Sequence, residues 1–251
     1  MVDIHSHLLP GVDDGSKSIE MSIPVLERFA ADGVECLVLT PHLTASQAAS
    51  APYERNQSLL EELRRVAPRE LDLRLGWEIM LDEPNVDLRG PHLGLGGSRA
   101  VLVEFSHRRV PLKAADELYR LRSSGVTPVL AHPERYYGCT LQSVEAWRDA
   151  GAVIQMDTGG LLGKGAISKL SRALVEEGLV DLFSSDNHGD SRTLATARDW
   201  LREVATPEHA ELLTRTNARR LLDNLPLFPV PPMRLGGSIF VRLRELFLSR
   251  L

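Results

Sequence analysis

The chain has 251 residues, 43% of them hydrophobic and 25% charged, and its formal net charge is −5. These values suit one globular domain with a sizeable core, and the acidic balance leaves no basic excess for nucleic acid or an anionic membrane. Two cysteines, Cys36 and Cys139, form no disulfide framework.

The N-terminus lacks the charged and apolar regions of a leader, and no apolar stretch approaches the ~20 residues of a membrane-spanning helix. A reducing compartment suits the two cysteines. We therefore expect a cytoplasmic protein.

Short apolar runs alternate with amphipathic helical patterns over the first 224 residues. The predicted strands are Val2–Ser6, Cys36–Thr40, Leu71–Met80, Ala100–Phe105, Pro128–Ala131, Val153–Asp157 and Val180–Ser185. The predicted helices are a segment before Gly33 that contains Pro24, Glu54–Val66, Leu112–Ser123, Lys169–Glu177, Ser191–Val204 and Pro207–Leu222. Such alternation predicts parallel β/α units, and seven strands favour a TIM-like barrel slightly short of eight. Glycines that end helical patterns before strands are Gly33, Gly125, Gly151 and Gly178.

The character of the chain changes at residue 225. Leu225–Pro232 is rich in proline and predicts an extended, polyproline-like segment. It leads to a short amphipathic stretch, Ser238–Leu251. We predict a domain over residues 1–224 and a tail over residues 225–251, which packs on the domain or a partner subunit, or docks on a membrane or a protein.

Potential metal ligands gather where the predicted strands end. His5 and His7 close the first strand, and positions i and i+2 of an extended chain point to the same side. The other candidates at strand ends or in the following loops are Asp14, which follows Asp13 in the motif Asp13-Asp14-Gly15, and His42, Glu78, Glu104, His132, Asp186 and His188. Each alone is typical of a hydrogen-bonded or solvated loop residue. Because the C-terminal ends of parallel strands form one face, their coincidence favours a metal site instead.

The ligand types narrow the chemistry. Imidazoles and carboxylates without thiolates suit Mn, Fe or Zn, and more than four ligands indicate more than one ion. Two ions ~3.5–4 Å apart can clamp an in-line displacement and hold a hydroxide at neutral pH. The sequence therefore predicts a hydrolase that acts on phosphate monoesters.

The motifs His5-x-His7, Thr40-Pro41-His42, Glu78, Glu104, His132 and Asp186-x-His188 resemble the polymerase and histidinol phosphatase (PHP) superfamily. The opening Asp3–His7 with Pro10–Gly15, together with Val103–Ser106 and Ala131–Arg135, looks like the bacterial PHP-type protein tyrosine phosphatases. Those enzymes accompany capsular and exopolysaccharide genes and act on bacterial tyrosine autokinases. The likeness runs from the first residue to about Leu222.

This resemblance implies a distorted (β/α)7 barrel that holds three divalent metals, with Mn favoured and Fe or Zn as alternatives. It implies three ligand sets: His5, His7, Glu78 and Asp186 for the first ion; Glu78, Glu104 and His132 for the second; Asp14, His42 and His188 for the third. It also gives Arg135 and Arg192 as phosphate-binding residues, which suits a guanidinium fork. The alternative for Arg135 is a salt bridge with Glu134.

The expected reaction is direct hydrolysis of phosphotyrosine by a metal-bridging hydroxide, with a tyrosine autokinase as partner. His107 is either a proton donor to the leaving group or a surface residue, and Asp157 either supports the site or caps the chain. Two other functions stay open: a small-molecule phosphatase such as histidinol-phosphatase, and a non-catalytic metal-binding module. Assembly into a homo-oligomer also stays open.

Overall fold

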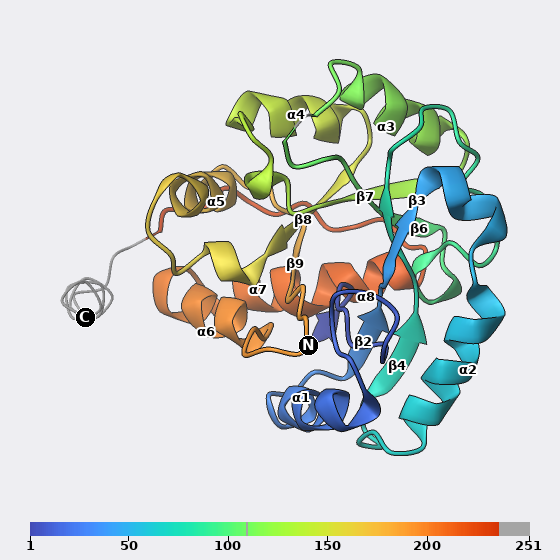
Figure 1. Cartoon of the computed structure of the whole chain (residues 1–251). Coiled ribbons are helices and arrows are strands. Elements are labelled where there is room, and N and C mark those ends of the chain that lie inside the picture. Colours follow the sequence, from blue (N-terminus) through green and yellow to red (C-terminus); the bar gives the residue numbers. More distant parts are fainter. Residues whose placement is uncertain (109, 236–251) are drawn as a thin grey trace.

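The computed structural model describes residues 1–108 and 110–235 as an α/β fold in which every paired strand is parallel to its neighbours. In Figure 1 the helices lie around the outside of the strands. The strands are β1 (Val2–Asp3), β2 (Cys36–Leu39), β3 (His42–Thr44), β4 (Asp72–Leu75), β5 (Glu78–Met80), β6 (Ala100–Glu104), β7 (Thr127–Ala131), β8 (Val153–Asp157) and β9 (Leu182–Ser184). The α-helices are α1 (Ile19–Ala31), α2 (Tyr53–Arg64), α3 (Ala114–Ser123), α4 (Leu141–Asp149), α5 (Ala166–Glu176), α6 (Ala195–Val204), α7 (Pro207–Glu211) and α8 (Asn217–Leu222).

The strands of the described residues do not close into the expected barrel. Three form one sheet in the order β1-β2-β4, and six form a second in the order β3-β5-β6-β7-β8-β9. The split falls at Pro41, which has no N–H to donate to a ladder, and at Gly76-Trp77. A single parallel bridge from Ser6 to Asn187 joins the chain after β1 to the chain after β9. The predicted α/β class with parallel strands is confirmed, whereas the predicted distorted (β/α)7 barrel is not, because these strands form no closed barrel.

The same breaks explain where the predicted strands differ from the observed ones. The run predicted as one strand over Leu71–Met80 is β4 and β5, and the second predicted strand is followed by β3, which was not predicted. Helix α4 was not predicted either, because few of its side chains are buried: Val144 and Trp147. Helix α1 accommodates Pro24, and the predicted helix over Pro207–Leu222 is α7, a π-helical stretch over Leu212–Thr216 and α8.

The core and the chain turns follow the predicted pattern. Strands β2, β6 and β8 are buried along their whole length, as expected for strands covered on both faces. The four glycines predicted to end helices all have positive φ: Gly33, Gly125, Gly151 and Gly178. None of the helices in the described ranges has the length and apolarity that a membrane crossing requires.

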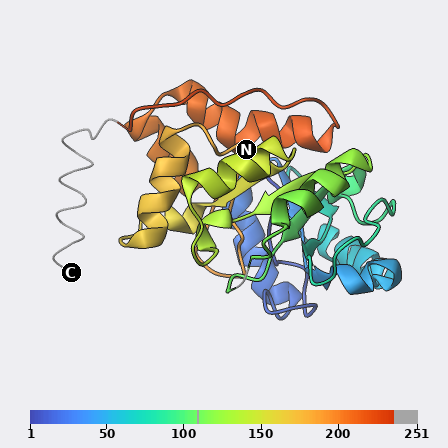
Figure 2. The ribbon, with the colours of Figure 1, turned by 90° about the horizontal axis from the view of Figure 1, so that it is seen from above.

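The proline-rich segment packs on the domain as extended chain as far as residue 235. Asn217 of α8 donates from its side-chain amide to the carbonyl of Phe228 and accepts from the Phe228 N–H. The N–H of Met233 donates to the carbonyl of Glu176 at the end of α5. Figure 2 shows this segment running along α8 on one side of the molecule. The amphipathic stretch Ser238–Leu251 lies outside the described residues.

Candidate metal centre

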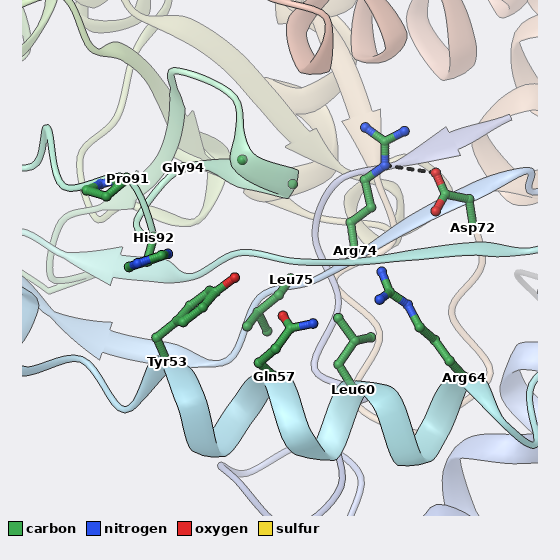
Figure 3. A pocket seen from close by; sticks show the side chains of 12 residues that line it. Tyr53, Gln57, Leu60, Arg64, Asp72, Arg74, Leu75, Pro91, His92 and Gly94 are labelled. Carbon is green, nitrogen blue, oxygen red and sulfur yellow. Dashed lines mark hydrogen bonds and ion pairs between the residues drawn. The ribbon is translucent and has the colours of Figure 1, made fainter.

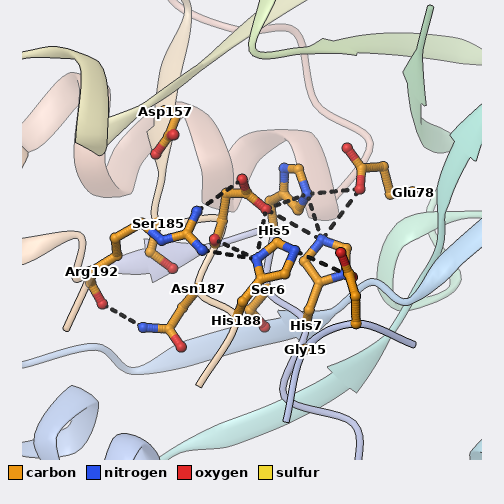
Figure 4. Close-up of polar contacts among 12 residues, drawn as sticks. His5, Ser6, His7, Gly15, Glu78, Asp157, Ser185, Asn187, His188 and Arg192 are labelled. Atoms are coloured by element: carbon orange, nitrogen blue, oxygen red, sulfur yellow. Dashed lines mark hydrogen bonds and ion pairs between the residues drawn. The ribbon is translucent and has the colours of Figure 1, made fainter. Parts of the chain in front are cut away.

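The strand ends deliver four ligand atoms to one buried point. His5 and His7 follow β1, Glu78 opens β5, and Asp186 follows β9. The Nε2 atoms of His5 and His7 lie 3.2 Å apart. Each lies 3.2 Å from Asp186 Oδ1, and they lie 3.3 and 3.2 Å from Glu78 Oε2. Figure 4 shows His5 and His7 pointing toward Glu78 from another part of the chain.

This spacing suits a metal ion. Two donors each about 2.1 Å from one ion lie about 3.0 Å apart at a right angle and about 3.4 Å apart at a tetrahedral angle. Buried histidines and carboxylates that face one another also need a compensating charge or proton. His132 also fits a bound ion, because its Nδ1 is buried and has no hydrogen-bond partner within the described residues. The residues therefore fit divalent ions.

The remaining predicted ligands extend this cluster to both sides. His132 Nε2 lies 2.7 Å from Glu78 Oε1, and His42 Nδ1 lies 3.0 Å from Glu78 Oε2. Asp14 Oδ1 lies 3.3 Å from His42 Nε2 and 3.4 Å from His188 Nε2. Five overlapping groups of ligand atoms result: His7, Asp14, His42 and His188; His5, Glu78 and His132; His5, His7 and Asp186; Glu104, His107 and His132; and His42, Glu78 and Glu104. The structure thus brings all nine predicted ligands together, and it adds His107.

Burial divides the cluster into an inner part and a mouth. His5, His7, Glu78 and Asp186 are at most 1% exposed. At the mouth the side chains of Asp14 and His42 are 68% and 42% exposed. Asp14, His42 and His188, whose side chain is 22% exposed, therefore form the solvent-facing side of the cluster.

Two ligands occupy backbone conformations that few non-glycine residues adopt. His132 has φ 34° and Asp186 has φ 47°. His132 directly follows β7, and Asp186 lies two residues after the end of β9; a left-handed residue turns the chain sharply at each place. Such conformations cost about 1–3 kcal/mol each and cluster at functional sites. Both observations mark the ends of β7 and β9 as built for the site.

The charges of the cluster are strongly coupled in the metal-free protein. Burial opposes protonation of His5, but Glu78 and Asp186 outweigh it and raise its pKa to about 9. Burial likewise opposes ionisation of Asp186, yet His5, His7 and Arg135 lower its pKa. The cluster therefore holds protons on histidines where an ion is absent.

Both predicted arginines lie beside this cluster and share one carboxylate. Asp186 Oδ2 accepts from Arg135 Nη2 at 2.7 Å and from Arg192 Nη1 at 3.2 Å. Arg192 also pairs with Asp190, and Arg135 with Asp157. The alternative of a salt bridge between Arg135 and Glu134 is not seen among the described contacts. Each guanidinium is about a quarter exposed, so its outer N–H groups can meet a ligand at the mouth.

The two open questions about neighbouring residues have structural answers. Asp157 both caps and supports: Oδ1 accepts from the Gly159 N–H, and Oδ2 binds Arg135. His107 is 44% exposed, yet its Nε2 lies 3.3 Å from Glu104 Oε2. It is thus a partly exposed residue at the edge of the cluster.

The residues behind the first two histidines were not predicted to support the site. Gln155 lies in the middle of β8, and its Oε1 lies 3.1 Å from His5 Nδ1. Asp13, seen only as part of a loop motif, lies 2.7 Å from His7 Nδ1. A polar residue inside the apolar run Val153–Met156 was the available signal for Gln155.

A separate groove of about 310 Å³ runs along α2. Figure 3 shows Tyr53, Gln57 and Arg64 on its helical side, with His92 and Arg74 opposite. Arg74 is already paired with Asp72 there. None of its lining residues belongs to the five ligand groups, so the metal centre lies elsewhere.

The chain is similar to a known family and to named relatives. A family model described as capsular polysaccharide synthesis, CpsB/CapC, matches residues 1–223. CapC of Staphylococcus aureus is 32% identical over 75% of this chain and 77% of its own. The tyrosine-protein phosphatase YwqE of Bacillus subtilis is 28% identical over 92% of this chain and 95% of its own.

The chain is also similar to solved structures. One from a study of YwqE of Bacillus subtilis and CpsB of Streptococcus pneumoniae, described as unique metal-dependent tyrosine phosphatases, has a TM-score of 0.74 at 26% identity. It covers 93% of this chain and all of its own. A β-aspartyl dipeptidase of Fervidobacterium islandicum, with a TM-score of 0.55 and 15% identity over 89% of this chain and 75% of its own, shares the fold alone. The chain belongs to the CpsB/CapC family.

Proposed function

We propose that this chain is a metal-dependent protein tyrosine phosphatase that hydrolyses phosphotyrosine on a bacterial tyrosine autokinase of polysaccharide synthesis. The observation that carries the proposal is the convergence of nine His, Asp and Glu ligands at one end of the parallel strands. The relatives named as tyrosine-protein phosphatases support the substrate class.

The ligand sets support a complement of three divalent ions, with Mn favoured over Fe or Zn. His5, His7, Glu78 and Asp186 would hold the first, Glu78, Glu104 and His132 the second, and Asp14, His42 and His188 the third. Once bound, the ions lower the pKa of a water molecule and neutralise charge on the phosphoryl oxygens. Oxygen and nitrogen donors without thiolate suit Mn.

The chain's own residues orient and stabilise the phosphoryl group. Arg135 and Arg192 stand over Asp186 with outer N–H groups free to bind phosphoryl oxygens as charge develops. Asp186 fixes both guanidinium groups, because one carboxylate oxygen accepts from each of them. The tyrosine leaving group departs as a phenolate, which needs little help from a strong acid.

Residues 1–224 would carry this activity, with residues 225–251 as an appendage, because the family model ends at residue 223. A cytoplasmic setting is part of the proposal. Cys36 and Cys139 are free thiols, which suits a reducing compartment.

The test compares substrates and metal states of the whole chain. Mn²⁺-loaded protein should release phosphate from a phosphotyrosyl peptide, and chelator-treated protein should not. Histidinol phosphate serves as the competing substrate and should turn over more slowly. Faster turnover of histidinol phosphate would favour a small-molecule phosphatase, and activity that survives removal of all metal would refute the metal-dependent mechanism.

A further inference from the structure

Asp13 lies directly behind the ring of His7. Its Oδ2 accepts from His7 Nδ1 at 2.7 Å, and the same oxygen accepts from the N–H of His42 at 3.2 Å. Its Oδ1 accepts from the N–H of Gly15 at 3.0 Å. One carboxylate therefore fixes a ring, its own loop and the start of β3, which carries a second ligand.

Gln155 occupies the same position behind the ring of His5. Its side chain is fully buried in β8, and Oε1 lies 3.1 Å from His5 Nδ1. The amide Nε2 of Gln155 has no hydrogen-bond partner within the described part of the chain. The oxygen is thus the atom of this side chain that the site uses.

The loop that carries Asp13 is clamped onto His7. A Cβ at Gly15 would lie 1.9 Å from the His7 carbonyl oxygen and 2.4 Å from its Cβ. The N–H of Ser16 donates to that same carbonyl at 2.8 Å. Figure 4 shows Gly15 close beneath His7. Only glycine fits this contact, so Asp13 cannot withdraw from the ring without a shift of the loop.

An acceptor at Nδ1 decides what the opposite nitrogen does. A neutral imidazole that donates its Nδ1–H keeps the lone pair on Nε2. In both rings Nε2 is the atom that faces Glu78 and Asp186. An acceptor behind the ring also fixes its orientation and raises its basicity as a ligand.

We infer that Asp13 and Gln155 are positioning residues that hold His7 and His5 as Nδ1–H tautomers, with both Nε2 lone pairs directed at one ion. The inference rests on the metal site of the proposed function and is independent of the substrate. Neither residue touches the reacting atoms. One acceptor is charged and the other neutral, so the two rings need not be equally strong ligands.

The test measures metal affinity rather than turnover. Mn²⁺ is titrated into metal-free protein in competition with a chromophoric chelator, for the wild type and for Asp13→Leu and Gln155→Leu. Loss of the acceptor should weaken Mn²⁺ binding by about 10–100-fold in each variant. Asp13→Asn and Gln155→Glu keep an oxygen acceptor and should lose less than the leucine variants.

The variants separate orientation from charge. Asp13→Leu removes an anion as well as an acceptor, whereas Asp13→Asn removes only the anion, and Gln155→Leu changes no charge. Asp82→Asn is the matched control, because Asp82 accepts from the backbone and hydroxyl of Ser46 and contacts no imidazole in the described residues. Alanine variants replace any leucine variant that does not fold.

A second readout reports the tautomers directly. Ring ¹⁵N resonances of Zn²⁺-loaded protein should show protonated Nδ1 in both His5 and His7. Unchanged Mn²⁺ affinity in the leucine variants, or a protonated Nε2 in either ring, would overturn this inference alone. Wild-type protein that binds none of Mn²⁺, Fe²⁺ and Zn²⁺ would overturn the inference together with the proposed function.

Discussion

Metal binding to this site should depend steeply on pH, because ions must displace protons from the inner histidines. In the metal-free protein burial opposes protonation of His5, but Glu78 and Asp186 raise its pKa to about 9. Burial also opposes protonation of His7, but the hydrogen bonds with Asp13, Asp186 and Glu78 outweigh burial and raise its pKa well above the ordinary value. At neutral pH both rings therefore carry a proton that a bound ion excludes.

The size of the effect follows from these pKa values. At pH 7, two units below a pKa of about 9, only about 1% of His5 is neutral, and removing its proton costs about 2.7 kcal/mol of binding free energy. His7 adds a second proton. Release of the His5 proton alone should raise the affinity about 10-fold for each pH unit up to about pH 9, and release of the His7 proton should make this dependence steeper, because the pKa of His7 is also raised.

The assay is calorimetry on protein stripped with a chelator. Mn²⁺ titrations at pH 7 in two buffers that differ in ionisation enthalpy give the number of protons released, which should be about two from these rings. Competition titrations at pH 7 and pH 8 give the slope of affinity, and the chelator's own pH dependence is measured as the control. Proton release near zero with a flat affinity would refute the proposed charge state of the inner cluster.

Three substitutions test the site and the fold. His5→Ala should lower hydrolysis of an aryl phosphate to the level of metal-stripped protein, because it removes one of the four inner ligand atoms; retained turnover would contradict that role. Arg135→Lys should lower kcat by about 10²–10³-fold in steady-state kinetics, because an ammonium cannot bind Asp186 and a phosphoryl oxygen with one rigid fork, and a change in KM alone would argue against transition-state stabilisation. Glu35→Gln should lower the free energy of unfolding by about 0.5–1 kcal/mol at pH 7, because the ion pair between Arg215 and Glu35 is partly exposed to solvent. The hydrogen bond from Arg215 lowers the folded pKa of Glu35 from 4.5 to about 2, so its stabilisation is present above pH 4.5 and lost as pH falls through about 2; urea unfolding should show the difference between wild type and variant vanish there.

The ligands could be predicted from the sequence because local pattern determines where strands end. His5 and His7 are two residues apart in extended chain, and Glu104 follows an apolar run that had to be buried. Strand parallelism then places such ends on one face whatever the closure of the sheet. The gathering of the ligands could therefore be predicted although the predicted barrel is not confirmed.

The supporting contacts could not be predicted, because they join distant parts of the chain. Gln155 is separated from His5 by 150 residues, and although a polar residue in an apolar strand is noticeable, the sequence does not indicate which group it contacts. The partners of Arg135 could not be predicted either. Proximity in sequence suggested Glu134, whereas the guanidinium pairs with Asp157 at the end of β8 and with Asp186 after β9. Which acid meets which base depends on tertiary register rather than on spacing.

The breaks that divide the strands into two sheets also position ligands of the metal centre. Pro41 separates β2 from β3, and Gly76-Trp77 separates β4 from β5, so His42 and Glu78 each begin a new strand and pair in register with one another. In an uninterrupted strand the alternation of side chains would fix the face on which His42 or Glu78 lies. The break allows the chain to change direction before each of these residues. His132 and Asp186 achieve the same result at the other ends through positive φ. Since left-handed backbone at a non-glycine residue is unfavourable, its presence at two ligands indicates that site geometry, rather than sheet closure, sets the chain path there.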